Sequence, residues 1–293
     1  MTTASKSHSP SSLKPTLMIV GAHADDHELC IGGTMAKYHG QGYEIAYVMS
    51  TNNMSGSWSR KMPDGSIQST TPPWHVIRPQ RILEAEAAAA ELGTKPIYLD
   101  HPQRHYVDDE GRKIEVRYGN PKPSCIPEDV PTILTAGHDK PSIRRMADLI
   151  HAYAPEAVIT HGMPMVNPEH FGTCLLVTEG YRLAESEGYR GMLLYFEDLG
   201  VPLLGTYGSL YNRWDTFIDV TDFFEEKIRL SGIHACQKPE PEKLDWPKWG
   251  PICHCGHAEV FDIVSEHSKE IRYGKFGQEI LAHAKQGPYI ENP

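Results

Sequence analysis

The chain reads TLMIVGAHADDHE over residues 16–28. Residues 16–22 are an apolar run with several β-branched side chains, which is typical of a parallel strand buried by helices on both faces. The polar residues that follow would lie at the carboxyl end of that strand, where open α/β sheets place their ligands. This stretch therefore predicts a central strand with a site at its end.

Helical and strand-like patterns alternate through the rest of the chain. Strands are expected over residues 43–51, 95–100, 156–160, 191–197 and 214–222. Helices are expected over residues 28–40, 80–92, 140–153, 170–187 and 222–236. Such alternation predicts an α/β fold with a doubly wound, mostly parallel, Rossmann-like sheet.

One domain is expected over residues 15–293, with a polar, Ser-rich disordered tail at residues 1–14. Residues 52–79 are polar and rich in Ser, Pro and Gly, and we expect a functional loop over a site. Residues 101–138 interrupt the alternation and are expected to form an insertion. The prediction is a single domain with long loop insertions.

Composition narrows the classes of partner. A formal net charge of −10 would repel nucleic acid, and no apolar run reaches the roughly 18 to 20 residues that a membrane-spanning helix needs. Six cysteines in 293 residues are too few for a disulfide framework, so a cytoplasmic location is expected. We expect a small-molecule substrate, and the extended loops and hydrophobic C-terminal segment favour a homo-oligomer.

Two turns carry residues suited to metal chemistry. His23 and Asp26 stand three residues apart after the first strand, and Asp25 lies beside them. His170, in the stretch Asn167 to His170, follows a later strand and can reach the same edge of the sheet. Three nitrogen or oxygen ligands with one open position are typical of catalytic zinc. Helix-capping carboxylates beside an unrelated histidine are the alternative for the first turn alone.

These motifs resemble those of the PIG-L/LmbE-like N-deacetylases. AHADDHE at residues 22–28 is similar to the family's AHPDDE, and NPEH at residues 167–170 is similar to its HPDH. The helix from Arg81 to Glu84 resembles the family's RxxE motif, and the segment from Lys227 to Gln237 resembles its K...HxSQ pattern. The matching segments span about residues 16–237.

The resemblance implies zinc ligation by His23, Asp26 and His170, with Asp25 as the general base; other divalent ions such as Fe²⁺ suit the same ligands. Ala24 and His27 depart from the family's proline and glutamate. Asn167 occupies the position of a histidine assigned to transition-state stabilisation, and we expect its amide to act as the donor instead.

The activity expected is therefore hydrolysis of an N-acetyl or N-acyl amide in a small polar substrate. The alternative is a metal-dependent hydratase that adds water to an unsaturated dicarboxylate, similar to oxalomesaconate hydratase. The Asp25-Asp26 pair favours hydrolysis, and a metal-binding module without catalysis fits least because it needs no adjacent base. Substrate contacts are expected from Arg81, Arg104 and His105.

Overall fold

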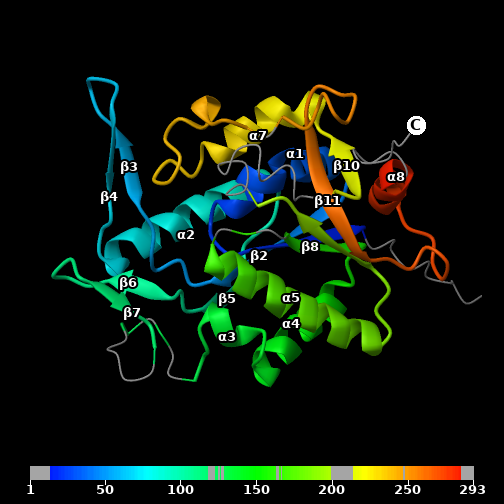
Figure 1. Cartoon of the computed structure of the whole chain (residues 1–293), viewed down its shortest axis with the longest axis horizontal. Coiled ribbons are helices and arrows are strands. Elements are labelled where there is room, and N and C mark those ends of the chain that lie inside the picture. The colour runs from blue at the N-terminus through cyan, green and yellow to red at the C-terminus, as the bar shows by residue number, and fades with distance from the viewer. Residues whose placement is uncertain are drawn as a thin grey trace, which may run out of the picture.

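The computed structural model describes residues 14–117, 129–162, 167–198, 214–246 and 248–284, together with residues 123, 124, 126 and 165. A seven-stranded sheet in the order β10-β11-β9-β8-β1-β2-β5 runs through its centre (Figure 1). The run from β9 to β5 is parallel, whereas β11 and β10 are antiparallel at one edge. The strands are β1 (Thr16–Gly21), β2 (Glu44–Thr51), β5 (Ile97–His101), β8 (Ala157–His161), β9 (Met192–Phe196), β10 (Thr216–Asp219) and β11 (Ala258–Ser265).

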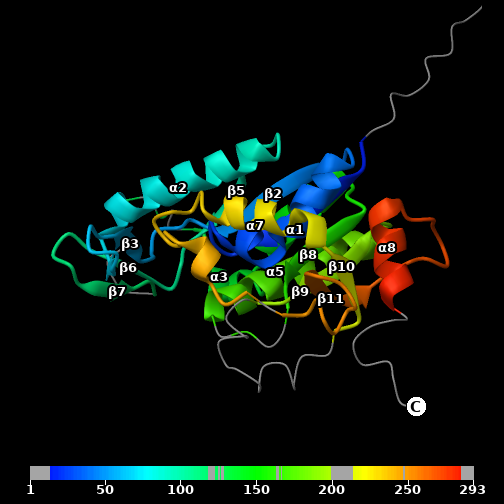
Figure 2. The ribbon, with the colours of Figure 1, turned by 90° about the horizontal axis from the view of Figure 1, so that it is seen from above.

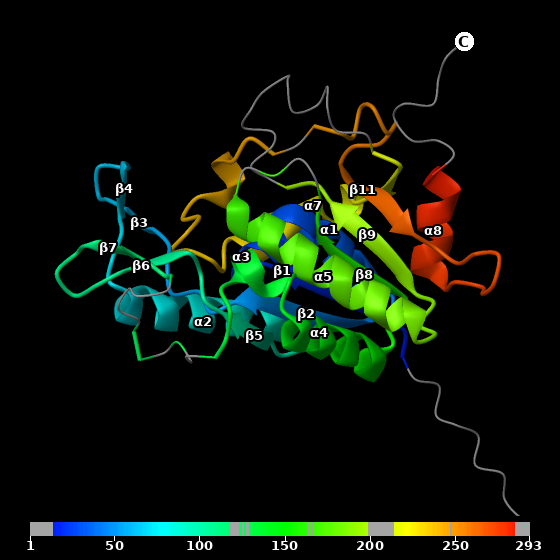
Figure 3. The ribbon, with the colours of Figure 1, turned by 60° about the horizontal axis from the view of Figure 1, so that its bottom comes forward.

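Helices cover both faces of this sheet (Figures 1 and 2). One face carries α1 (Asp26–Gly40), α2 (Trp74–Glu91), α7 (Phe224–Ser231) and α8 (Lys275–Ala284). The other carries α3 (Ile133–Ala136), α4 (Lys140–Tyr153) and α5 (Pro168–Ser186), as Figure 3 shows from below. The expected doubly wound, mostly parallel α/β fold is confirmed.

Strand β1 lies at the centre of the core because its two faces are both apolar. Leu17 and Ile19 pack into the layer with α1, and Met18 and Val20 pack into the layer with α4 and α5. All four side chains are fully buried. Its parallel neighbours β2 and β8 bring their own carboxyl ends to the same edge, so residues after β1 and β8 meet there.

Several boundaries differ from the sequence prediction. The segment 52–79 contains a hairpin, β3 (Trp58–Lys61) with β4 (Ile67–Thr70), and α2 starts at Trp74 although Pro79 lies inside it. The predicted insertion contains a second hairpin, β6 (His105–Val107) with β7 (Lys113–Glu115), and α3. Helix α7 ends at Ser231, before Gly232. Residues 1–13 of the predicted tail lie outside the described residues, and the one-domain boundary stays a prediction.

A break in α1 is held by a buried ion pair. Ile31 has φ −133° and interrupts the helix, so nearby backbone groups lose their helical partners. The Glu259 carboxylate accepts from two amides just after the break, and the Lys227 ammonium donates to the Cys30 carbonyl and, over 2.6 Å, to Glu259. Side chains from two distant segments therefore fix the course of α1 beside the site.

Among the described segments, no helix is both long enough and apolar enough to span a lipid bilayer.

Candidate active site

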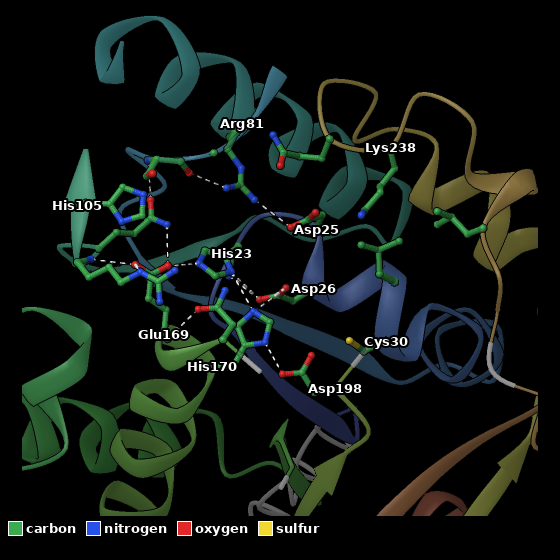
Figure 4. Close-up of a pocket in the computed structure, with 18 of the residues that line it drawn as sticks. His23, Asp25, Asp26, Cys30, Arg81, His105, Glu169, His170, Asp198 and Lys238 are labelled. Carbon is green, nitrogen blue, oxygen red and sulfur yellow. Dashed lines mark hydrogen bonds and ion pairs between the residues drawn. The ribbon is translucent and has the colours of Figure 1, made fainter. Parts of the chain in front are cut away.

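A cavity of about 440 Å³ opens at the carboxyl edge of the parallel strands (Figure 4). Its floor includes His23, Asp25 and Asp26 from the turn after β1. His170 enters from the start of α5, the helix after β8. The two turns singled out in the sequence therefore meet in one cavity.

The turn after β1 is fixed by hydrogen bonds to its own backbone. The His23 amide donates to Asp26 Oδ2 over 2.7 Å, and the Ala24 amide donates to Asn53 Oδ1 over 2.9 Å. Asn53 itself has a left-handed φ of 54°, a conformation that asparagine tolerates better than most residues. The side chains of His23 and Asp26 are consequently held toward the cavity.

Three ligand atoms converge at the cavity floor. His23 Nδ1 lies 3.1 Å from His170 Nε2 and 3.4 Å from Asp26 Oδ2, while His170 Nε2 lies 3.4 Å from the other Asp26 oxygen, Oδ1. Ligand atoms about 2.1 Å from a tetrahedral zinc ion lie roughly 3.4 Å from one another, so the observed spacings match three corners of such a site. The fourth corner is available for a substrate or water molecule.

Both histidines are oriented by carboxylates at their other ring nitrogens. His170 Nδ1 lies 2.6 Å from Asp198 Oδ2, and His23 Nε2 lies 2.6 Å from Glu169 Oε2. With those nitrogens donating, the lone pairs of His23 Nδ1 and His170 Nε2 face each other. Two lone pairs and a carboxylate oxygen in contact repel one another unless a proton or a metal cation lies between them, so the donor set fits a divalent ion when neither facing nitrogen is protonated.

The charges around the candidate ligands also favour a cation at this position. Burial lowers the pKa of His23, but Asp26 and Glu169 outweigh burial and raise this pKa to about 10. Burial works against ionisation of Asp26, but the surrounding His170, His23 and His161 hold the pKa of Asp26 well below its usual range. The protein thus stabilises positive charge at the point where the three ligand atoms meet.

Asp25 lies beside these atoms and is held by Arg81. Arg81 Nη2 donates to Asp25 Oδ1 over 2.9 Å, and Arg81 Nη1 donates to the Ser55 carbonyl over 2.9 Å. The side chain of Asp25 is 12% exposed and that of Arg81 is 4% exposed, so both are shielded from bulk water while lining the cavity. Asp25 therefore has one oxygen fixed by the guanidinium, in a place suited to a base.

Comparison with known proteins agrees with this geometry. A family model described as GlcNAc-PI de-N-acetylase, PIG-L, matches residues 18–180, more than half of the chain. The chain belongs to the PIG-L family. The match includes both turns of the site and the Arg81 helix, whereas Asp198 and the later segments of the cavity lie beyond it.

Relatives in this family are distant in sequence. A diacetylchitobiose deacetylase from Thermococcus kodakarensis is 23% identical over 238 residues, which cover 80% of this chain and 73% of that protein. A 4-carboxy-2-hydroxymuconate hydratase, GalB, from Pseudomonas putida superposes with a TM-score of 0.56 at 19% identity, covering 89% and 99% of the chains. The N,N'-diacetylchitobiose deacetylase of Pyrococcus horikoshii gives 0.52 at 17% identity, covering 85% and 83%. These structures show the shared fold.

Other residues expected at the PIG-L site also line the cavity. Asn167 caps α5, because its Oδ1 accepts from the Glu169 amide over 3.0 Å, which leaves the amide nitrogen as its donor group. Arg104 and His105 lie at the rim, and the Arg104 guanidinium Nε lies 4.0 Å from Glu169. Burial and nearby Lys113 lower the pKa of His105. The structure thus brings all eight predicted site residues to one cavity, and their roles stay predictions.

Three neighbours of the candidate ligands are not evident from the sequence. Glu169 and Asp198 orient His23 and His170, and His161 stacks on His170 with ring centroids 4.0 Å apart. His161 Nε2 also lies 3.2 Å from Asp26 Oδ2. Position in the sequence was the available signal: His161 ends β8, Glu169 lies in the first turn of the helix after β8, and Asp198 follows β9, so all three lie at the carboxyl edge of the sheet.

Proposed function

We propose that this PIG-L protein is a zinc-dependent hydrolase that removes an N-acetyl or N-acyl group from a small polar substrate. The observation that carries the proposal is the convergence of His23, Asp26 and His170, whose closest ligand atoms lie 3.1 to 3.4 Å apart pair by pair, beside a shielded carboxylate. The deacetylase relatives and the family model support the amide as the bond that is cleaved. Zinc is the ion we expect from the two imidazoles and one carboxylate.

His23, Asp26 and His170 would hold the ion. When bound, a divalent ion supplies Lewis acidity, which polarises a carbonyl group and makes water a stronger nucleophile near neutral pH. Glu169 and Asp198 hold the two imidazoles in the required tautomer. The protein's own contribution at this end of the cavity is therefore a fixed, buried set of ligands.

Asp25 would act as the proton carrier. Its carboxylate accepts a proton from the attacking water and returns that proton to the departing amine, so that the base ends each turnover as it began. The hydrogen bond from Arg81 keeps Asp25 in place during both transfers. The Asn167 amide nitrogen donates toward the oxyanion of the tetrahedral intermediate, a role that neutral amides fill in other hydrolases.

Metal analysis and a product screen together test the proposal. We expect about one zinc per chain in the wild-type protein and none in His170→Ala. The screen uses acetylated amino sugars, acyl amides and unsaturated dicarboxylates. Release of free amine and carboxylate supports the hydrolase, whereas hydration of a dicarboxylate with no amide cleavage establishes the hydratase alternative that the GalB likeness leaves open.

A further inference from the structure

Lys238 stands out among the charged groups that line the cavity. Asp25 pairs with Arg81, Asp245 with Lys248, and Arg104 approaches Glu169. The Asp26 and Asp198 carboxylates face histidines. Among the described residues, no carboxylate lies within ion-pair distance of the Lys238 ammonium. The cavity therefore contains a cation whose counter-charge the described part of the protein does not supply.

Lys238 also differs from the other lysines of the described chain. Each of the remaining lysines without an ionic partner is exposed, so water solvates its charge: Lys14, Lys95, Lys113, Lys140, Lys269 and Lys275. Lys238 is only partly exposed. Removing an ammonium from water without pairing it costs free energy. A partly buried ammonium at a cavity wall, with no ionic partner among the residues that the structure describes, is therefore a candidate site for an anion.

The position of Lys238 suits contact with a bound substrate. Its amide donates to the His234 carbonyl over 2.8 Å, which fixes the backbone just beyond α7. Figure 4 shows its side chain pointing into the cavity, on the opposite side from His105. Leu29 and Leu244 also line the cavity, so apolar groups accompany this charge.

We propose that the substrate carries a carboxylate or phosphate group that pairs with Lys238 while the scissile amide lies at the metal ligands. This inference rests on the proposed function, because it assumes that the cavity receives an amide. A lysine ammonium serves as a point charge for either kind of anion, and such charge-assisted hydrogen bonds are stronger than neutral ones. Lys238 is thus a specificity residue that selects anionic over neutral amides.

Equilibrium binding to zinc-loaded protein with Asp25→Asn, which keeps the amide intact, tests the assignment. In each of two matched pairs, one probe carries an anionic group that the other lacks: N-acetylglucosamine 6-phosphate with N-acetylglucosamine, and N-acetylalanine with N-acetylalanine amide. Calorimetry is expected to show an anionic probe binding about 10- to 100-fold more tightly than its neutral partner. The pair that shows the preference distinguishes phosphate from carboxylate.

Variants in the same background assign the preference to one side chain. Lys238→Met is expected to abolish it, and Lys238→Arg, which keeps the charge, is expected to retain it. Lys243→Met, a change at an exposed lysine in the same segment, is the matched control. The assignment is overturned if neither anion binds more tightly than its neutral partner, or if the preference survives in Lys238→Met with an unchanged melting temperature. Failure of the proposed function would appear separately, as absent amide cleavage by the wild-type protein.

Discussion

Replacing Glu169 by Gln is expected to weaken metal binding by moving a proton on His23. Three donors point at the Glu169 carboxylate: His23 Nε2 at 2.6 Å, the Arg104 amide at 2.9 Å and Gln103 Nε2 at 3.0 Å. A glutamine offers one acceptor oxygen and one NH₂ group, so at least one of these donors would face another donor. His23 can relieve this conflict by carrying its proton on Nδ1, the atom that faces the metal position.

The expected loss of zinc affinity follows from the role of Glu169 as the carboxylate that orients His23. Loss of a carboxylate that orients a metal-binding histidine costs about 10- to 100-fold in metal affinity, or roughly 1.4 to 2.7 kcal/mol. Zinc titration against a chromophoric chelator at constant pH measures this change directly. Glu179→Gln on the same helix is the control, because Glu179 pairs with Arg182 near the surface and with no other ionic partner among the described residues.

Zinc affinity in Glu169→Gln within about twofold of the wild type would refute this reasoning. It would mean that Glu169 does not set the tautomer of His23. Histidine ¹⁵N spectra of the zinc-loaded protein provide a second readout, since they report which ring nitrogen carries the proton.

Three further changes are expected to act at separate places. Asp25→Asn should keep its zinc by metal analysis but lose ~100- to 10,000-fold in kcat, and retained turnover would exclude Asp25 as the base. Lys227→Met leaves buried Glu259 without its cation, so urea unfolding should show a loss of about 3 kcal/mol; an unchanged midpoint would contradict the role of this pair. Burial and Asp215 raise the pKa of Asp262 from 3.8 to about 7, so its stabilising contribution is full below pH 3.8 and is lost as pH rises through 7. Asp262→Asn should flatten the unfolding free energy over this range, and a profile as steep as the wild type's would contradict that assignment.

The fold was predictable where local pattern and burial agree. Strand β1 is apolar on both faces, and the residues after it lie where any parallel sheet exposes them, so the core and the site edge follow from residues 16–28. The antiparallel pairing of β10 and β11 was not predictable in this way, because its direction depends on the long connection between the two strands. Strand β11 was missed for this reason. The two hairpins have short connections and were missed because they lie in segments that interrupt the regular alternation of strands and helices.

The meeting of the candidate metal ligands was predictable from the sequence. His23, Asp26 and His170 were singled out because metal-binding residue types occur at two strand ends, and the structure brings them together. Asp198 lies 28 residues from His170, and only packing of β9 beside β8 brings its carboxylate to that ring. Arg81 was expected to contact substrate, and the structure gives it a partner, Asp25, that no spacing in the sequence reveals.

The most direct test of the account is diffraction from zinc-loaded crystals with data on both sides of the zinc absorption edge. We predict one anomalous peak per chain, about 2.0 to 2.2 Å from His23 Nδ1, His170 Nε2 and an Asp26 oxygen. A peak at another position, such as among His161, His170 and Asp198, or no peak at the cavity floor, would contradict the account.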